Sequence, residues 1–323
     1  MRPEDAARRR HYGRFYELDP PPGGDRPLLV VHGNCQAEAL RVVLEASDPS
    51  LDAVRVPPVH ELEADDLPYL DRLLARTDLL VAQPVRDDWR DLPVGTAQVH
   101  ARAPRARLVV VPVIRHTGLH PWGALVRTPW MGDPPTVPYH DLRTILAVAR
   151  GTGRRPVGHL RPAGFRAVAG RSLDELRRRE ERHGAVPASD LVEAAGAGAM
   201  LTINHPGNPV LVPLAGRVLE ACGLSAVARD PGRTLLASVR APIRPEVLDA
   251  LGLDPAAADA AWGARQAPPP DGHRAGGDTW DVGGTRIDDD AVAREQAAWY
   301  AERGPVVAAA LERYAPAIEA LGL

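Results

Sequence analysis

Lysine is absent from this chain, and cysteine is nearly so. All 39 basic residues are arginine, which excludes a lysine phosphate loop, a Schiff-base lysine and a pyridoxal cofactor. The two cysteines, Cys35 and Cys222, are too few for a disulfide framework or a Cys-based zinc site, and they are compatible with a reducing cytoplasm. No apolar run approaches the roughly 20 residues that a membrane helix needs. We therefore expect a cytoplasmic protein without a membrane span.

The bulk composition is that of a globular domain of moderate size. The 323 residues are 45% hydrophobic and 25% charged, and the net charge of −3 gives no reason to expect a nucleic-acid partner. We expect three segments: a polar N-terminal arm over 1–27, an α/β catalytic domain over 28–225, and a Pro/Ala-rich segment with C-terminal helices over 226–323 that packs on the same unit. Tyr12, Phe15 and Tyr16 are the residues expected to order part of the arm.

Short apolar runs alternate with amphipathic segments from residue 28 onward. Strands are predicted at 28–32, 54–56, 79–83, 107–113 and 200–203, and helices at 37–46, 66–76, 141–150, 172–182, 189–197, 210–221 and beyond Asp288. The pattern predicts an α/β fold in which a parallel sheet is flanked by helices in three layers. Ligands bind such sheets at the carboxyl ends of the strands. Residues 268–284, rich in proline and glycine, are expected to form an exposed loop that Trp280 tacks down.

Cys35 lies at the point where the first predicted strand meets a helix. A cysteine at a helix N-terminus, after the tight turn that Gly33 permits, has reason to be a nucleophilic thiolate. The amides of Asn34, Gln36 and Gln83, with backbone N–H groups at Cys35 and Gln36, are candidates for an oxyanion site. The alternative is that Cys35 is a small buried hydrophobe, as many cysteines are.

A cysteine nucleophile needs a base, and two histidines have suitable contexts. His205 follows an apolar run and is fixed between Asn204 and Pro206, and His120 lies in a loop-rich region. Asp141 and Asp190 are candidates for orienting the base. His116 and His120 are four residues apart, but Gly118 and Pro121 argue against the helix that a metal pair would need, so no metal is expected.

Five motifs in order carry a family resemblance. They are Gly33-Asn34-Cys35-Gln36, Gln83 at a strand end, Gly118-Leu119-His120-Pro121, Tyr139-His140-Asp141 and Thr202-Ile203-Asn204-His205-Pro206. Over about residues 28 to 225 the chain resembles the WcbI-type capsular polysaccharide biosynthesis proteins, which are regarded as acetyltransferases. It is also distantly similar to SGNH-type hydrolases, with Cys35 in place of their serine and Asn34 in place of their aspartate.

The resemblance implies binding of coenzyme A or acetyl-CoA and acetyl transfer to a hydroxyl of a polysaccharide or sugar precursor. The mechanism that we expect has Cys35 attack the thioester, with His205 or His120 as base. In a variant of it, His205 deprotonates the acceptor directly and Cys35 only shapes the pocket, with Asn204 among the pocket residues. CoA phosphates need cations, for which Arg115, Arg127 and Arg143 are candidates, with Tyr139 beside them.

Three other functions use the same residues. A thiol-dependent esterase or deacetylase acting on glycans would differ only in needing no CoA. A non-catalytic CoA- or glycan-binding protein would need the pocket but not the thiol as a nucleophile. If Cys35 only fills the core, its thiol would be inert in the folded protein. The acceptor sugar, the acyl group and the oligomeric state do not follow from the sequence.

Overall fold

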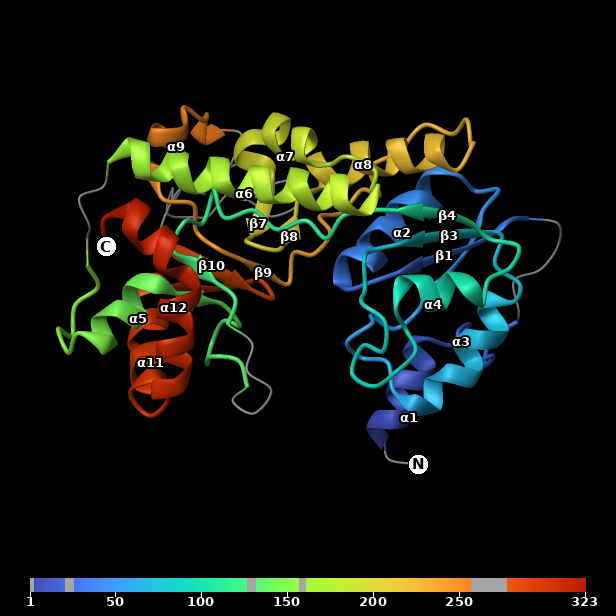
Figure 1. The fold of residues 1–323 in the computed structure, drawn as a ribbon, viewed down its shortest axis with the longest axis horizontal. Helices are drawn as coiled ribbons and strands as arrows, with labels where there is room; N and C mark the ends of the chain where they lie inside the picture. The colour runs from blue at the N-terminus through green and yellow to red at the C-terminus, as the bar shows by residue number, and fades with distance from the viewer. Residues whose placement is uncertain (1–2, 21–25, 127–131, 157–160, 257–277) are drawn as a thin grey trace. The chain divides into compact units, whose positions relative to one another are not determined.

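The computed structural model describes residues 3–20, 26–126, 132–156, 161–256 and 278–323 (Figure 1). The chain divides into two compact units, each assembled from three stretches. Unit 1 comprises Met1–Val113, Arg177–Leu191 and Asn208–Leu235, and unit 2 comprises Ile114–Leu176, Val192–Gly207 and Leu236–Leu323. These boundaries differ from the linear segments 1–27, 28–225 and 226–323 that the sequence indicates, because elements distant in sequence pack together within each unit.

Unit 1 is built on a parallel sheet of four strands in the order β2-β1-β3-β4. The strands are β1 (Leu28–His32), β2 (Asp52–Val54), β3 (Leu79–Ala82) and β4 (Arg107–Val110). This confirms the α/β class with a parallel sheet flanked by helices. The strand expected at 54–56 begins earlier, because Asp52 and Val54 are the residues that pair with Leu28 and Val30 of β1.

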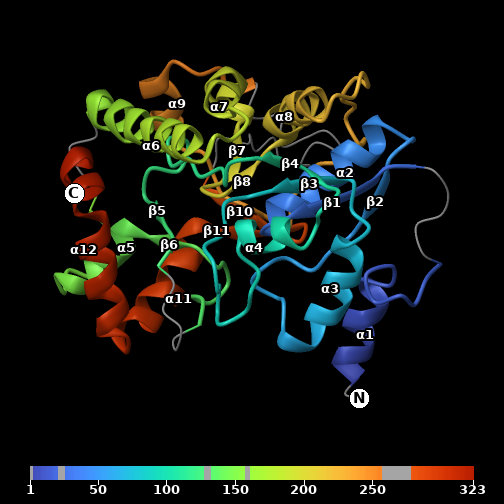
Figure 2. The same ribbon diagram turned by 45° about the vertical axis from the view of Figure 1, so that its right-hand side comes forward.

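Helices cover both faces of this sheet, as Figure 2 shows. Val30 and Leu80 point to one face, where they pack with α3 (Leu67–Leu74), the N-terminal residues and Val99 of α4 (Thr96–Ala101). Alternate strand residues point to the other face. There β1 contacts α2 (Cys35–Ser47), which packs in turn on α8 (Asn208–Ala221). Three layers result, because strands buried on both faces need an apolar cover on each.

The N-terminal residues complete the core of unit 1. After α1 (Pro3–His11), the aromatic residues Tyr12, Phe15 and Tyr16 are buried against the sheet and α3. The Tyr16 hydroxyl donates to Oδ1 of Asp66 at 2.6 Å, and Arg8 pairs with the same carboxylate. The three aromatic residues therefore pack the N-terminal segment onto the rest of unit 1, and this ordered packing extends over most of its described residues.

Unit 2 is mainly helical. Its core lies between α5 (Leu142–Ala149), α11 (Asp289–Ala301) and α12 (Gly304–Leu321), where Tyr300 and Ile145 are buried (Figure 1). The other elements are β5 (Gly123–Ala124), β6 (His140–Asp141), β7 (Met200–Thr202), β8 (His205–Pro206), β9 (Val239–Arg240), β10 (Thr279–Val282), β11 (Thr285–Asp288) and α9 (Pro245–Leu251). No helix in the described part of the chain combines the length and apolarity that crossing a membrane requires.

Two expectations about local structure are wrong. Residues Thr279–Val282 do not belong to an exposed loop but form β10, between β9 and β11, and Trp280 is packed down as expected, with 9% of the residue exposed. Residues 268–277 of that expected loop lie outside the described residues. Ser172 and Glu175 match a capping box and so predict a helix start at Ser172, but the helix there is α6 (Pro162–His183), which starts well before Ser172. Ser172 is not its cap, because its hydroxyl accepts a hydrogen bond from the Thr117 N–H at 3.1 Å.

Glu180 is a buried anchor within unit 1 and not, as its charged neighbours indicate, part of a solvated helix face. One carboxylate oxygen accepts from the N–H groups of Ala188 and Ser189, each at 2.9 Å, and the other accepts from the Ser189 hydroxyl at 2.7 Å. These bonds tie α6 to the start of α7 (Ser189–Ala195). An anion at this helix start also matches the positive end of the helix dipole.

We expect Glu180→Ala to lower the free energy of unfolding by about 2 kcal/mol or more. The substitution leaves buried hydrogen-bond donors, which bond a charged carboxylate in the wild type, without an acceptor. Chemical denaturation followed by circular dichroism measures this. Glu181→Ala, which removes an exposed carboxylate from the same helix, should stay within about 0.5 kcal/mol of the wild type. Equal losses in the two variants would contradict the anchoring role.

Candidate functional site

The strand order places Cys35 at a switch point of the sheet. β1 pairs with β2 on one side and with β3 on the other, so the connections that leave β1 and β3 diverge. Crevices at such switch points, at the carboxyl ends of the strands, are where open α/β sheets bind ligands. Cys35 follows β1 as the first residue of α2, and Gln83 follows the adjacent strand β3. The sheet therefore brings together the two motifs that the sequence indicates at this edge.

Side-chain hydrogen bonds hold the Cys35 turn in one conformation. Asn34 caps α2, with its Oδ1 accepting from the Gln36 N–H at 2.9 Å. The Oε1 of Gln83, which is 2% exposed, accepts from the Asn34 N–H at 2.8 Å, and its Nε2 donates to Gln36 Oε1 at 3.2 Å. Asn34, Gln36 and Gln83 thus form one network around the residue that carries the thiol.

This network changes which donors are left for an oxyanion. The Gln36 N–H already bonds the capping oxygen, and Gln83 uses both ends of its amide on Asn34 and Gln36. Because Asn34 must turn its oxygen toward Gln36 to cap the helix, its Nδ2 points away from that bond. Nδ2 has no hydrogen-bond partner among the described residues. It is therefore a better candidate donor than the Gln36 N–H or the Gln83 side chain.

The two cysteines differ in accessibility. Cys35 is partly exposed at the start of α2, whereas Cys222 is buried just beyond α8. Burial raises the pKa of the Cys222 thiol and disfavours its thiolate. The helix start, in contrast, directs backbone N–H groups toward the first turn that contains Cys35. Cys35 is accordingly the candidate nucleophile, whereas the environment of Cys222 is that of a residue packed in the core.

Unit 2 holds a second group of the predicted residues. The Tyr139 hydroxyl donates to Asn204 Oδ1 at 2.9 Å and accepts from the Thr202 hydroxyl at 2.9 Å. The ring of His205 meets the Tyr139 ring edge to face, with centroids 6.2 Å apart. Tyr139, Asn204 and His205 therefore lie together. The order of their motifs along the chain does not predict this proximity.

His205 and His120 have the same charge state but different surroundings. Burial lowers the pKa of each to about 4, so both rings are neutral at pH 7. The His120 ring is fully enclosed, with its nitrogens 3.3 and 3.4 Å from the backbone oxygens of Pro242 and Met200. His205 is partly exposed. A neutral, accessible imidazole can accept a proton, which favours His205 over His120 as the base.

The two carboxylates expected to orient the base are engaged elsewhere. Asp141 caps α5 by accepting from the Arg143 and Thr144 N–H groups, and it pairs with the Arg143 guanidinium at 2.6 Å. Asp190 pairs with Arg217. The hydrogen bonds and ion pairs of Asp141 and Asp190 therefore indicate that these carboxylates stabilise the fold. The described residues contain no group of three or more acidic, histidine or cysteine side chains arranged to hold a metal ion.

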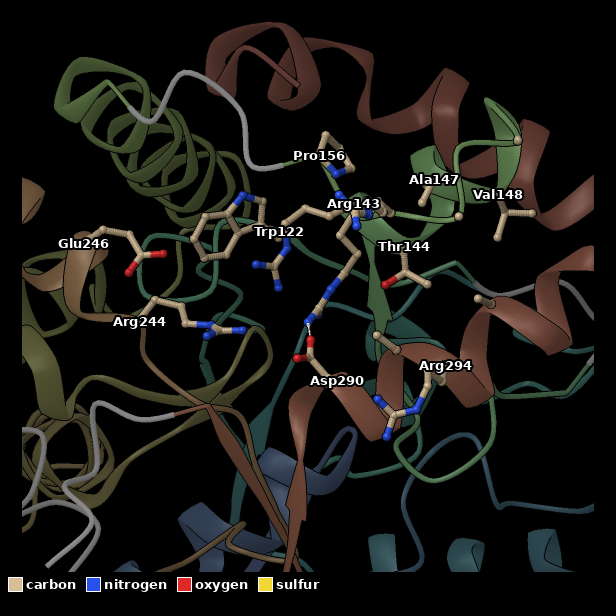
Figure 3. A pocket seen from close by; sticks show the side chains of 16 residues that line it. Trp122, Arg143, Thr144, Ala147, Val148, Pro156, Arg244, Glu246, Asp290 and Arg294 are labelled. Carbon is tan, nitrogen blue, oxygen red and sulfur yellow. Dashed lines mark hydrogen bonds and ion pairs between the residues drawn. The ribbon is translucent and has the colours of Figure 1, made fainter.

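The candidate phosphate-binding arginines have different environments. Arg127 lies outside the described residues, and Arg115 is exposed. Arg143 lines a pocket of about 850 Å³ in unit 2, shown in Figure 3. Four further arginines line this pocket and were not singled out from the sequence: Arg154, Arg155, Arg244 and Arg294. Arg154 and Arg155 are adjacent, but the four arginines come from three stretches of the chain that no spacing in the sequence connects.

Gly33 permits the close approach of Gln83. A Cβ placed at Gly33 would lie 2.3 Å from the Gln83 Oε1, well inside contact distance. We expect Gly33→Ala to displace Gln83, break its bond to the Asn34 N–H and lower the free energy of unfolding by about 1–3 kcal/mol. Urea denaturation checks the stability, and the rate of Cys35 alkylation should change. Gly170→Ala, at a helix position with open space, is the control. An unchanged alkylation rate in Gly33→Ala would contradict the role assigned to this contact.

Comparisons with known proteins agree with this architecture. The family model for the polysaccharide biosynthesis enzyme WcbI matches residues 28–227. A solved structure of WcbI is similar with a TM-score of 0.73 and 20% identity over 92% of this chain and 98% of that one. That WcbI is described as a novel polysaccharide biosynthesis enzyme, in its native form without a disulfide bond between CoA and a cysteine. A comparison with curated proteins gave no match. Since the family model covers more than half of the sequence, this chain belongs to the WcbI family of polysaccharide biosynthesis enzymes.

Proposed function

We propose that this protein is a CoA-dependent acyltransferase that moves an acetyl group from acetyl-CoA to a hydroxyl of a polysaccharide or sugar precursor. The observation that carries the proposal is the position of Cys35, partly exposed at the first turn of α2 in a turn braced by Asn34 and Gln83. The structurally similar WcbI is described with reference to a disulfide between CoA and a cysteine. Its description supports Cys35, the accessible thiol, as the group that meets the CoA sulfur.

The first half of the reaction forms an acyl-enzyme. The Cys35 Sγ, as the thiolate, attacks the thioester carbonyl carbon and forms a new C–S bond. The Asn34 Nδ2 donates to the oxyanion that develops on the carbonyl oxygen. When the tetrahedral intermediate collapses, the bond to the CoA sulfur breaks and CoA leaves as a thiolate, which takes a proton from water. The α2 N-terminus stabilises the negative charge on Cys35 before attack.

The second half transfers the acetyl group to the acceptor. A sugar hydroxyl attacks the acetyl-Cys35 carbonyl while His205 accepts its proton, and the Cys35 thiolate leaves. With a pKa of about 4, His205 is neutral at pH 7 and has a ring nitrogen that can accept a proton. In the one-step variant the hydroxyl attacks acetyl-CoA directly, His205 has the same role and Cys35 is never acetylated. Arg115 and Arg143 are the proposed contacts for CoA phosphates, and Tyr139 is proposed as a further CoA-binding residue.

Binding of CoA and acetylation of Cys35 can be measured separately. Calorimetric titration should show saturable binding of CoA and acetyl-CoA to the wild type and to Cys35→Ala, because the proposed contacts include the CoA phosphates as well as the thiol. Mass spectrometry should detect an acetyl adduct on the wild type but not on Cys35→Ala. Cys222→Ala, which removes the buried thiol, should retain the adduct. Thermal melting of each variant tests that it is folded.

Each outcome discriminates between functions. Absence of CoA and acetyl-CoA binding would overturn the acyltransferase proposal and favour the esterase or deacetylase, which hydrolyses an acetylated sugar without CoA. Binding with transfer that survives in Cys35→Ala would support the one-step variant. Binding without any transfer to glycan acceptors or adduct would favour a CoA-binding protein that is not catalytic.

The pH dependence of acetyl transfer tests the role of His205. If His205 must be neutral to act as a base, the rate of acetyl transfer from acetyl-Cys35 to the acceptor should fall as the pH drops through about 4, and not near the ordinary histidine pKa of 6.5. His205→Gln should lower kcat by about 10²- to 10⁴-fold. His183→Gln, at the exposed end of α6, is the control. A kcat for acetyl transfer in His205→Gln equal to that of the wild type, with the fold intact by circular dichroism, would exclude His205 as this base.

A further inference from the structure

The arginine-lined pocket of unit 2 is a built cavity with a fixed interior. Its walls come from α5 and the loop after it, from the start of α9 and from α11. Figure 3 shows Trp122 and Glu246 toward one end and Arg294, which projects from α11, toward the other. The volume of about 850 Å³ falls in the range of small-molecule sites.

One buried carboxylate fixes three of the arginines. Asp289, whose side chain is 5% exposed, pairs with Arg155 at 2.7 Å, with Arg244 at 2.6 Å and with Arg143 at 3.6 Å. The Trp280 Nε1–H donates to the same carboxylate at 2.8 Å. The Arg143 guanidinium also lies over the Trp122 ring, 4.3 Å from its centroid. Side chains held in this way lose little further entropy when a ligand binds.

These anchored arginines use only part of their hydrogen-bonding capacity. Each guanidinium has five N–H donors. Arg155 gives one nitrogen to Asp289 and another to Asp290, and Arg244 gives one to Asp289 and another to Asp278. The Nε of each makes no contact with an acid in the described part of the chain. Oriented N–H groups of this kind suit the oxygens of a phosphate.

Arg154 and Arg294 supply the positive charge of the pocket that no described acidic side chain offsets. Both line the pocket, both are exposed, and neither has an acidic partner among the described residues. The acids that contact the three anchored arginines offset their charge, and Glu246 lies at the far end of the pocket from Arg294. An anion in the pocket would therefore be attracted mainly by these two side chains.

We propose that this pocket binds the phosphate groups of a phosphorylated reactant, with Arg154 and Arg294 as its principal charge contacts. The inference rests on the proposed function in that the ligand is one of its two reactants. The diphosphate and 3′-phosphate of CoA and the phosphate of an activated sugar acceptor share the required chemistry. The pocket is large enough for a diphosphate with part of the group attached to it.

The test measures binding of three probes by calorimetry: inorganic pyrophosphate, CoA and a UDP-sugar. The double variant Arg154→Ala/Arg294→Ala removes both exposed arginines and leaves the Asp289 cluster intact. The control is Arg150→Ala, which removes an exposed arginine at the end of α5 that does not line the pocket. Thermal melting should show the double variant folded, because neither side chain has a structural partner in the described residues.

We expect the wild type and Arg150→Ala to bind pyrophosphate in a salt-dependent manner, and the double variant to bind it at least tenfold more weakly. A parallel loss of CoA affinity assigns the pocket to the cofactor, and a loss of UDP-sugar affinity with unchanged CoA affinity assigns it to the acceptor. Unchanged affinity for all three probes in the double variant would overturn the proposal. If neither reactant supports acetyl transfer but pyrophosphate binding still depends on these arginines, the proposed function fails and the phosphate pocket stands.

Discussion

The approach of Gln83 to the backbone at Gly33 is the contact on which the candidate site depends. It joins the carboxyl ends of two adjacent strands through one buried amide, which also fixes the residue that caps α2. A thiol at the first turn of a helix is activated only if that turn keeps its position, because the effect of the helix dipole falls off within about a turn. The positions of Asn34, Cys35 and Gln36 are thus set by a side chain far away in sequence.

The same device of one buried polar group that serves several elements recurs elsewhere. Glu180 bonds the start of α7, and Asp289 gathers arginines from α5, the loop after it and the start of α9. Removing water from a charge is costly unless partners replace the lost hydrogen bonds. Each of these buried carboxylates is therefore stable only with donors around it. In a chain with many flexible arginines and no lysine, buried acids determine which guanidinium groups become fixed.

The sequence predicted the elements of unit 1 well, because period-two and period-3.6 patterns mark buried strands and amphipathic helices directly. It also placed Cys35 and Gln83 at one sheet edge, since parallel topology follows from the alternation of strands and helices. It missed the start of α6, where Ser172 and Glu175 imitate a helix start in the middle of a longer helix. It missed β10, because a two-residue glycine turn and its short strands resemble a loop when their pairing partner β9 is far away in sequence. Of the five arginines that line the pocket, the sequence analysis singled out only Arg143, since Arg143, Arg244 and Arg294 become neighbours by tertiary packing alone.

Because unit 1 is assembled from three stretches of the chain, it cannot finish folding until late in synthesis. The sheet is complete once residue 110 has been synthesised, but α8, which packs on α2, begins only at Asn208. Until then the apolar face of α2 that α8 later covers stays open to solvent on the nascent chain. Domains generally fold as units during synthesis, so the stretch that follows β4 must emerge before this half of the molecule can close. A ribosome-bound chain that ends near residue 113 would carry the Cys35 turn without its mature packing.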